Sequence, residues 1–379
     1  MKARAWPMRL WLAPLAALAL GAVLAGCTSP ERPKPAPLPA NVALIGVKAA
    51  WTNSIGAVAF PLELRVVGDV LFAAASDGTV AAINTTTGAD VWRARLNTAL
   101  SAGVGSDGRF AAVVSKENDL IVVEAGKTVW RQRLGAATLT APLVAGARVF
   151  VLSADRTVTA FDAATGRRLW QQVRSGEALV LGQSGLLTAV GDTLVVGLGG
   201  RLVGMNPQSG ASRWESLVAS GRGTNEVERL ADLVAGFSRE GNQLCVRAFQ
   251  HAIACVDAAN GRTLWAKTAN GGAGVAGDAA AVFSAEGDGR ILALSRKDGE
   301  RLWLSERLRF RQLSTPLSLG RSVVFGDDAG NLHFLSKEDG APLTRVATDE
   351  SGVAVAPVLS GQTLVVVTRK GVVRAFRPD

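Results

Sequence analysis

The sequence predicts an all-β protein that closes into a ring of eight four-stranded antiparallel blades, a β-propeller. The first observation is a Trp, replaced once by Thr, that recurs about every 42 residues along the 379-residue chain. The second is that short apolar runs of strand length, bounded by Gly-Asp and Asp-Gly turns, fill each interval. About four such strands in one interval is the size of a propeller blade. The recurring positions are Trp51, Trp92, Trp130, Trp170, Trp214, Trp265, Trp303 and Thr344.

Each repeat carries the same turn before its Trp. In the clearest copies a strand runs into an Asp, Asn or Ser, a pair such as Thr-Gly follows, and the Gly is predicted to take a positive φ. Because the Trp recurs once per blade, we interpret it as a wedge between neighbouring blades rather than as part of a ligand cage. The clear copies span 77–92, 155–170, 200–214, 251–265 and 288–303, and weaker copies span 118–130 and 330–344.

The two ends of the repeat region complete one another. The last copy, Lys370–Phe376, stops before a Thr-Gly turn or a Trp, whereas Val47–Trp51 supplies a strand that ends in Trp. We therefore expect the N-terminal strand to close the last blade, which leaves no free sheet edge between the ends. The propeller is predicted to span residues 42–379.

The N-terminal segment is typical of an exported lipoprotein. Residues 1–26 combine a basic front with an apolar run that is short for a membrane span, and Leu24–Cys27 resembles a bacterial lipobox. This resemblance implies cleavage before Cys27 and acylation of that residue, with an ordinary secretory cleavage site as the alternative. Thr28 in place of Asp implies, by the sorting convention of such lipoproteins, an outer-membrane anchor that faces the periplasm. Residues 27–41, with five prolines, are predicted to form an extended tether.

Composition and charge exclude several classes of function. The formal net charge of +9 comes from scattered Lys and Arg residues, so nucleic acid is not an expected partner. Two His and three Cys are too few for a multi-histidine metal enzyme, and His251 and His333 are interpreted as ordinary blade residues. Gly103–Gly108 matches G-x-G-x-x-G, but an apolar strand rather than a helix follows it. We expect no metal and no cofactor.

The repeat unit Asp-Gly-x-Val-x-Ala-x-Asp-x-x-Thr-Gly-x-x-x-Trp resembles that of quinoprotein dehydrogenase propellers. Together with the lipobox, residues 20–379 resemble the BamB family, the lipoprotein subunits of the outer-membrane β-barrel assembly machinery. A more specific match is Gly223–Asp232, which is similar to the family segment Gly-Ser/Thr-x-Glu-Ile-Asp-Arg-Leu-Ser-Asp. Leu179-Val180-Leu181 matches the family's Leu-x-Leu one blade earlier, although Gly182 and Val234 stand where the family has Arg and a second acid.

This resemblance implies a non-enzymatic scaffold subunit, a monomer within a hetero-oligomer. It implies binding to the periplasmic POTRA domains of BamA and to other assembly subunits, and help in folding and inserting outer-membrane proteins. Whether these unfolded clients bind the propeller directly stays open. The implied contact residues are Leu179, Leu181, Glu226, Arg229, Leu230 and Asp232. Spacing indicates the same region, because Trp214 to Trp265 is the longest Trp interval, its extra residues fall in Ser216–Asp232, and insertions on repeat scaffolds lie in loops that often bind.

Two other functions are weighed against this one. A pyrroloquinoline-quinone-dependent dehydrogenase fits the repeat, but such enzymes are usually much longer and carry a calcium-binding set and a catalytic Asp on their insertions. In this chain nearly every residue is predicted to belong to a blade or a short turn, which leaves no room for such insertions. We therefore predict that it is not an enzyme. The second alternative is a periplasmic binding propeller with an unrelated partner.

Two local features complete the predictions. Cys245 and Cys255 flank a predicted hairpin at about equal distance from Gln250, so a disulfide across the strand pair is predicted, with two buried thiols as the alternative. A basic stretch is interpreted as a solvated loop, or as a surface that faces an acidic partner or lipid headgroups. It consists of Arg301, Arg307, Arg309 and Arg311.

Overall fold

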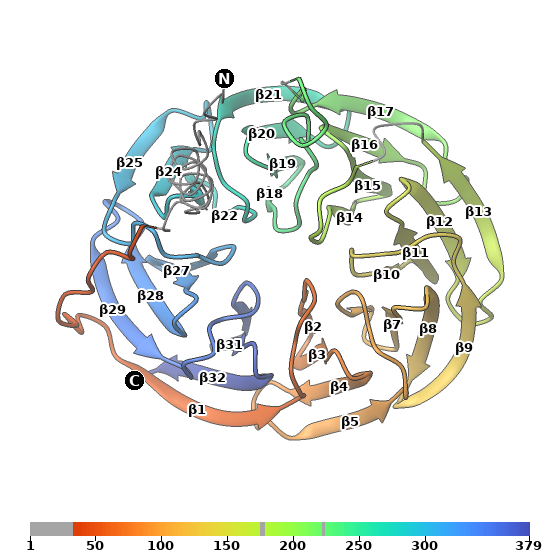
Figure 1. Cartoon of the computed structure of the whole chain (residues 1–379), viewed down its shortest axis with the longest axis horizontal. Helices are drawn as coiled ribbons and strands as arrows, with labels where there is room; N and C mark the ends of the chain where they lie inside the picture. Colours follow the sequence, from red (N-terminus) through yellow and green to blue (C-terminus); the bar gives the residue numbers. More distant parts are fainter. Residues whose placement is uncertain (1–32, 175–178, 222–223) are drawn as a thin grey trace, which may run out of the picture. The chain divides into compact units, whose positions relative to one another are not determined.

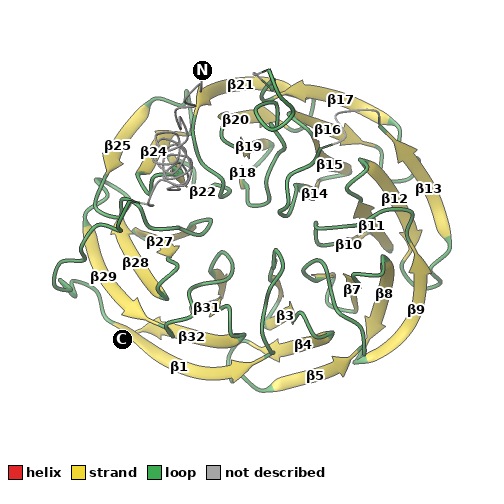
Figure 2. Cartoon of the chain, viewed as in Figure 1, coloured by secondary structure: helices red, strands yellow, loops and turns green. Residues whose placement is uncertain are grey.

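The computed structural model describes residues 33–174, 179–221 and 224–379, so the predicted signal segment 1–26 and Cys27 lie outside the described residues. Residues 36–379 form one compact unit, in which the described chain builds eight four-stranded sheets arranged in a ring (Figure 1). Figure 2 shows these elements as strands and loops. Among the described residues no helix is long and apolar enough to cross a membrane. The predicted eight-bladed propeller is confirmed.

The blades are numbered here in chain order, each from its inner strand to its outer strand. Blade 1 consists of β2 (Arg65–Val67), β3 (Val70–Ala74), β4 (Thr79–Asn84) and β5 (Asp90–Arg95). Blade 2 consists of β6 (Gly105–Ser106), β7 (Phe110–Val114), β8 (Asp119–Glu124) and β9 (Lys127–Arg133). Blade 3 consists of β10 (Leu143–Ala145), β11 (Arg148–Leu152), β12 (Thr157–Asp162) and β13 (Arg168–Val173). Blade 4 consists of β14 (Leu187–Val190), β15 (Thr193–Leu198), β16 (Arg201–Met205) and β17 (Ser212–Leu217).

The second half of the ring follows the same order. Blade 5 consists of β18 (Ser238–Glu240), β19 (Gln243–Ala248), β20 (Ala252–Asp257) and β21 (Arg262–Thr268). Blade 6 consists of β22 (Ala276–Gly277), β23 (Ala281–Ala285), β24 (Ile291–Ser295) and β25 (Arg301–Ser305). Blade 7 consists of β26 (Leu317–Leu319), β27 (Ser322–Gly326), β28 (Asn331–Ser336) and β29 (Pro342–Ala347). Blade 8 consists of β30 (Val358–Ser360), β31 (Thr363–Val367), β32 (Val372–Pro378) and β1 (Val47–Ser54).

The hydrophobic core lies between neighbouring blades. The two middle strands of a blade are covered on both faces, so β3 and β4 are buried along almost their whole length, whereas the outer strand β9 is mostly exposed. One apolar cluster joins Leu71 and Ile83 of blade 1 to Val365 and Val373 of blade 8. Because each blade packs its apolar side chains against both neighbours, the ring is stabilised as a whole rather than blade by blade.

Each predicted wedge Trp lies against the turn glycine of the following blade. The ring of Trp51 covers Gly88 so closely that a Cβ on this glycine would lie 2.6 Å from the indole. The Trp51 Nε1 also donates to Thr85 O at 2.9 Å, and Trp130, Trp170, Trp265 and Trp303 bond to the next blade in the same way. The full set of pairs is Trp51–Gly88, Trp92–Gly126, Trp130–Gly166, Trp170–Gly210, Trp214–Gly261, Trp265–Gly299 and Trp303–Gly340.

Strands from the two ends of the chain close the ring. β1 lies antiparallel beside β32, with Trp51 opposite Ala375. In the other blades, a glycine turn joins the third strand to the outer strand and receives the Trp of the preceding blade. In blade 8 these two strands, β32 and β1, come from opposite ends of the chain, so no such turn joins them. The residue of blade 7 that would face this turn is Thr344 instead of Trp. The Asn41 side chain lies beside it, with Nδ2 3.4 Å from Thr344 Oγ1. The one missing Trp therefore coincides with the closure.

Residues 36–46 lie against blade 7 and the connection that leads into it; we call them the strap. Ala36 O accepts a hydrogen bond from Arg311 Nη2 at 2.9 Å. Further along the strap, Leu44 N donates to Leu343 O of β29 at 2.7 Å. The later residues of the predicted tether are thus hydrogen-bonded to the ring.

Candidate functional site

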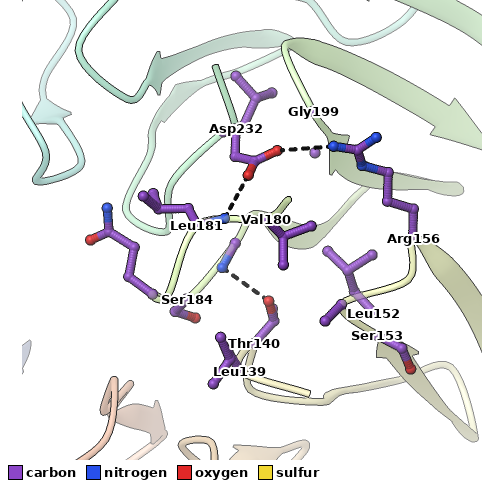
Figure 3. A pocket seen from close by; sticks show the side chains of 15 residues that line it. Leu139, Thr140, Leu152, Ser153, Arg156, Val180, Leu181, Ser184, Gly199 and Asp232 are labelled. Atoms are coloured by element: carbon purple, nitrogen blue, oxygen red, sulfur yellow. Dashed lines mark hydrogen bonds and ion pairs between the residues drawn. The ribbon is translucent and has the colours of Figure 1, made fainter. Parts of the chain in front are cut away.

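The two segments that carry the binding motifs are brought together by the fold. Leu179–Leu181 precede blade 4. The predicted segment Ser216–Asp232 begins in the last two residues of β17 and continues into the connection to blade 5, which we call the inserted loop; residues 222–223 lie outside the described residues. A groove of about 700 Å³ lies between the two segments. A smaller side cavity of about 60 Å³ adjoins it and shares Arg156, Gly199 and Asp232 with its lining (Figure 3).

Five of the six predicted contact residues line the groove. They are Leu179, Glu226, Arg229, Leu230 and Asp232. Leu181 lines the side cavity instead, together with Leu139, which precedes blade 3, and Leu152 of β11. Residues that are far apart in the sequence and belong to three blades thus form one continuous surface.

A single capped turn shapes the tip of the inserted loop. Asn225 Oδ1 accepts a hydrogen bond from Glu228 N at 2.9 Å, and the Glu228 carboxylate accepts one from Thr224 N at 2.8 Å, so each side chain satisfies a backbone donor that the short turn leaves free. The hydrogen bond from Thr224 N lowers the pKa of Glu228. This turn leaves Glu226 exposed, and Val227 is 68% exposed. Both side chains are therefore accessible to a partner, and Glu226 also lines the groove.

Asp232 differs from the other predicted contact residues because its carboxylate is turned into the protein. Its Oδ2 accepts a hydrogen bond from Leu181 N at 2.8 Å, and its Oδ1 lies 3.7 Å from Arg156 Nη2 (Figure 3). The side chain retains only 15% exposure. Asp232 therefore ties the inserted loop to the Leu179–Leu181 segment, a role that the motif alone did not indicate.

The groove has mixed charge and an apolar strip. Arg174 and Glu215 form an ion pair of 2.7 Å on its wall, and Leu217, 51% exposed, and Leu230 provide apolar surface. The charged lining residues are Arg156, Arg174, Arg201, Arg229, Glu215, Glu226 and Asp232. Charges of both signs beside partly exposed leucines suit a folded protein surface better than a small anion or an apolar ligand.

Arg156 is the functional candidate that sequence reasoning missed. It lies in the turn between β11 and β12, two blades before the inserted loop, and lines both the groove and the side cavity. The sequence does contain a signal for Arg156, because it replaces the glycine of the repeat. The strong copies in blades 1 and 6 have Asp77-Gly78 and Asp288-Gly289 where blade 3 has Asp155-Arg156.

A third hollow, of about 620 Å³, is lined by the loops that precede the inner strands of six blades. In this hollow the Glu63 carboxylate of blade 1 contacts Ser184 Oγ of blade 4. Burial raises the pKa of Glu63, opposed by this hydrogen bond. Within the described ranges, no three His, Cys, Asp or Glu side chains gather as a metal site would require.

The remaining predicted features take these places in the structure. His251 Nδ1 lies 2.7 Å from Phe249 O, and His333 is buried in blade 7 with its Nε2 2.9 Å from Asp327 Oδ2. Gly103–Gly108 runs into β6, and the strand β7 follows it. Among the basic stretch, Arg301 and Arg307 are exposed. Arg309 faces Asp288, whereas Arg311 bonds to Asp327 and to the strap.

Cys245 and Cys255 face one another in neighbouring strands. The register of β19 and β20 places them directly opposite, and their sulfurs are bonded in the structure. Both residues are fully buried between blades 5 and 6.

Comparisons with known proteins bear on the whole chain. A family model described as outer membrane protein assembly factor BamB matches residues 76–305, more than half of the chain. A protein of that name from Burkholderia pseudomallei is 36% identical over 377 residues, which is 98% of this chain and 99% of that protein.

Two solved structures share the fold. The crystal structure of BamB from Moraxella catarrhalis superposes with a TM-score of 0.80 at 22% identity, covering 87% of this chain and 99% of that one. Quinohemoprotein alcohol dehydrogenase from Comamonas testosteroni superposes with a TM-score of 0.69 at 16% identity, covering 90% and 78%. At such identities the structures speak only for the propeller fold, but the sequence matches show that the chain belongs to the BamB family of outer membrane protein assembly factors.

Proposed function

We propose that the protein is a scaffold subunit of the outer-membrane β-barrel assembly machinery and that the groove binds the periplasmic POTRA domains of BamA. The observation that carries this proposal is the meeting of two separate motifs. Leu179–Leu181 and the loop Ser216–Asp232 share one groove, and Asp232 holds them together through Leu181 N. In that position the subunit would assist the folding and insertion of outer-membrane proteins by holding BamA and the other subunits in place.

The anchor is part of the same proposal. Acylated Cys27 would attach the protein to the inner leaflet of the outer membrane, with the propeller in the periplasm, because several acyl chains give stable membrane attachment where one does not. Cys27 lies outside the described residues, so the support for this step is the lipobox in the sequence. Metabolic labelling with radioactive palmitate, compared between the wild-type chain and Cys27→Ser, tests it: loss of label in the variant is expected.

We further propose that the protein acts by binding and not by catalysis. The family name describes an assembly factor. The quinohemoprotein dehydrogenase shares the fold at 16% identity, which leaves a quinone enzyme as the alternative. Titration of the purified protein with pyrroloquinoline quinone while Trp fluorescence is recorded separates the two. Linear inner-filter quenching is expected, and saturable quenching in the micromolar range would favour the enzyme.

Co-purification of BamA tests the groove. The double variant Leu179→Asp with Glu226→Lys places a charge at an apolar lining position of the groove and reverses the charge on the loop tip. The matched control is Leu302→Asp with Glu338→Lys, since Leu302 is 54% exposed on β25 and Glu338 is exposed in blade 7, away from the groove. We expect BamA recovery to fall at least tenfold for the groove variant and to stay unchanged for the control.

The outcomes of this experiment separate two kinds of failure. Full BamA recovery with the groove variant would show that the groove is not the interface. Failure of the wild-type chain to recover BamA would argue instead for a propeller with another partner, the remaining alternative.

A further inference from the structure

One turn position in the ring has a conformation that most side chains avoid. In six blades the turn between the two middle strands contains a residue with positive φ whose N–H donates to the carbonyl three residues earlier. In four of these blades the residue is glycine, as expected where φ is positive. The six residues, with their φ values, are Gly78 (95°), Asn118 (66°), Arg156 (64°), Gly289 (81°), Gly330 (81°) and Gly371 (79°).

Arg156 is the exception in this series. Asn tolerates the left-handed region because its short polar side chain bonds locally, but Arg has no such compensation. Its backbone follows the same pattern, with Arg156 N donating to Ser153 O at 2.9 Å. Nothing in the turn itself requires an Arg there. Residues held in an unfavourable φ region often mark functional sites, where the side chain serves a purpose that the backbone does not.

The side chain of Arg156 reaches the groove. Its Nη2 lies 3.7 Å from Asp232 Oδ1, and the two side chains are only 13% and 15% exposed. The other carboxylate oxygen of Asp232 accepts the hydrogen bond from Leu181 N (Figure 3). Arg156 of blade 3 is thus linked through one carboxylate to both binding segments, one before blade 4 and the other before blade 5.

We propose that Arg156 is a positioning residue of the BamA-binding groove, which holds Asp232 so that the inserted loop and the Leu179–Leu181 segment keep their binding arrangement. The inference rests on the proposed function of the groove. Without the guanidinium, the half-buried carboxylate loses its ion-pair partner, and water competes for the Leu181 amide. The two segments then separate more readily, and binding must first restore their arrangement.

Arg156→Gly separates this role from a structural one. Glycine, which blades 1, 6, 7 and 8 carry at this position, relieves the backbone strain and offsets the loss of the ion pair, so the melting temperature of the variant is expected to stay close to that of the wild type. The affinity for the purified periplasmic domains of BamA, measured by calorimetry, is expected to fall about fivefold to tenfold. A residue that serves only the fold would not give unchanged stability together with weakened binding.

Three further variants make the test decisive. Asn118→Gly changes the equivalent strained turn of blade 2, away from the groove, and should leave the affinity unchanged. Arg156→Asn suits the left-handed backbone but is too short to reach Asp232, so it should bind as weakly as Arg156→Gly. Combining Arg156→Gly with Asp232→Asn should weaken binding no further than Asp232→Asn alone, because both changes remove the same ion pair between Arg156 and Asp232.

The inference is overturned if Arg156→Gly and Arg156→Asn both bind BamA as tightly as the wild type while Leu179→Asp with Glu226→Lys does not bind. If the wild type fails to bind BamA, the proposed function itself fails, and with it this role. If both Arg156 variants lose stability in proportion to their loss of affinity, Arg156 serves the fold and the inference is rejected.

Discussion

The indole of Trp265 in blade 5 occupies the space that a side chain on Gly299 of blade 6 would need. A Cβ on Gly299 would lie 2.6 Å from Trp265 Cε3, and the indole Nε1 donates to Arg296 O at 2.8 Å in the same turn. Gly299 also has a φ of +73°. The relationship explains why the repeat carries both residues, since its glycine receives the Trp of the preceding blade and its own Trp lies on the glycine of the following blade. The glycine makes the flat surface on which the Trp of the preceding blade lies.

Gly299→Ala should therefore weaken the docking of two blades. We expect it to lower the free energy of unfolding by about 2–4 kcal/mol, because the positive φ and the displaced indole both cost energy. Guanidinium denaturation followed by Trp fluorescence measures the change. Gly241→Ala is the matched control, since Gly241 has a φ of +58° but no atom lies within 4 Å of its Cβ position. Equal losses for the two variants would mean that the Trp contact contributes nothing.

The buried carboxylate of Asp327 predicts a loss of stability at low pH. Burial alone would raise its pKa, but hydrogen bonds from His333 and from Asn331 lower it from 3.8 to about 2. Because the folded pKa lies below the unfolded one, the ionised carboxylate stabilises the fold above about pH 4, and this contribution disappears as the pH falls toward 2. Its full size is about 2 kcal/mol.

Asp327→Asn isolates this contribution. The difference in unfolding free energy between the wild type and the variant should shrink by about 2 kcal/mol between pH 5 and pH 2, as the wild-type carboxylate takes up its proton. Urea denaturation at half-unit pH steps measures the difference and cancels the titration of the other acids. A difference that is constant over this range would show that Asp327 does not titrate there.

The ring could be predicted from the sequence because its signal is repeated and local. The spacing of the Trp positions determines the number of blades, and the half copy at Lys370–Phe376 together with Val47–Trp51 indicates the closure. The missing Trp at position 344 looked like a degenerate repeat. The structure gives it a physical reason, since no glycine turn lies across from it.

The details of the site could be predicted only in part. The motif located the groove, but the direction in which Asp232 points depends on Leu181 and Arg156, which are remote in the sequence and close only in the folded ring. The strap was missed for another reason. Proline-rich composition predicts an extended backbone, but it does not predict which surface an extended segment lies on.

The strap is expected to stay on the ring through Asn41. This side chain accepts a hydrogen bond from Arg345 N at 2.8 Å and donates to Arg345 O at 3.1 Å. Asn41→Ala should weaken this attachment by about 1–2 kcal/mol and expose residues 36–46 to protease. Thermolysin digestion followed by mass spectrometry measures the cleavage rate there. Asn242→Ala, at an exposed turn of blade 5, should leave the rate unchanged. Equal cleavage of the wild type and Asn41→Ala would contradict a docked strap.

The pairing of Cys245 with Cys255 predicts a disulfide that persists in the mature protein. The two residues lie opposite each other in β19 and β20 with no exposed surface, and an exported protein meets an oxidising compartment. In protein that is denatured without reductant, alkylation should leave both residues unmodified in peptide mass spectrometry, and it should label both after reduction. The double variant Cys245→Ala with Cys255→Ala should unfold about 2–3 kcal/mol more easily, because the unfolded chain regains the freedom that the cross-link removes. Alkylation of both residues before reduction would show two buried thiols instead.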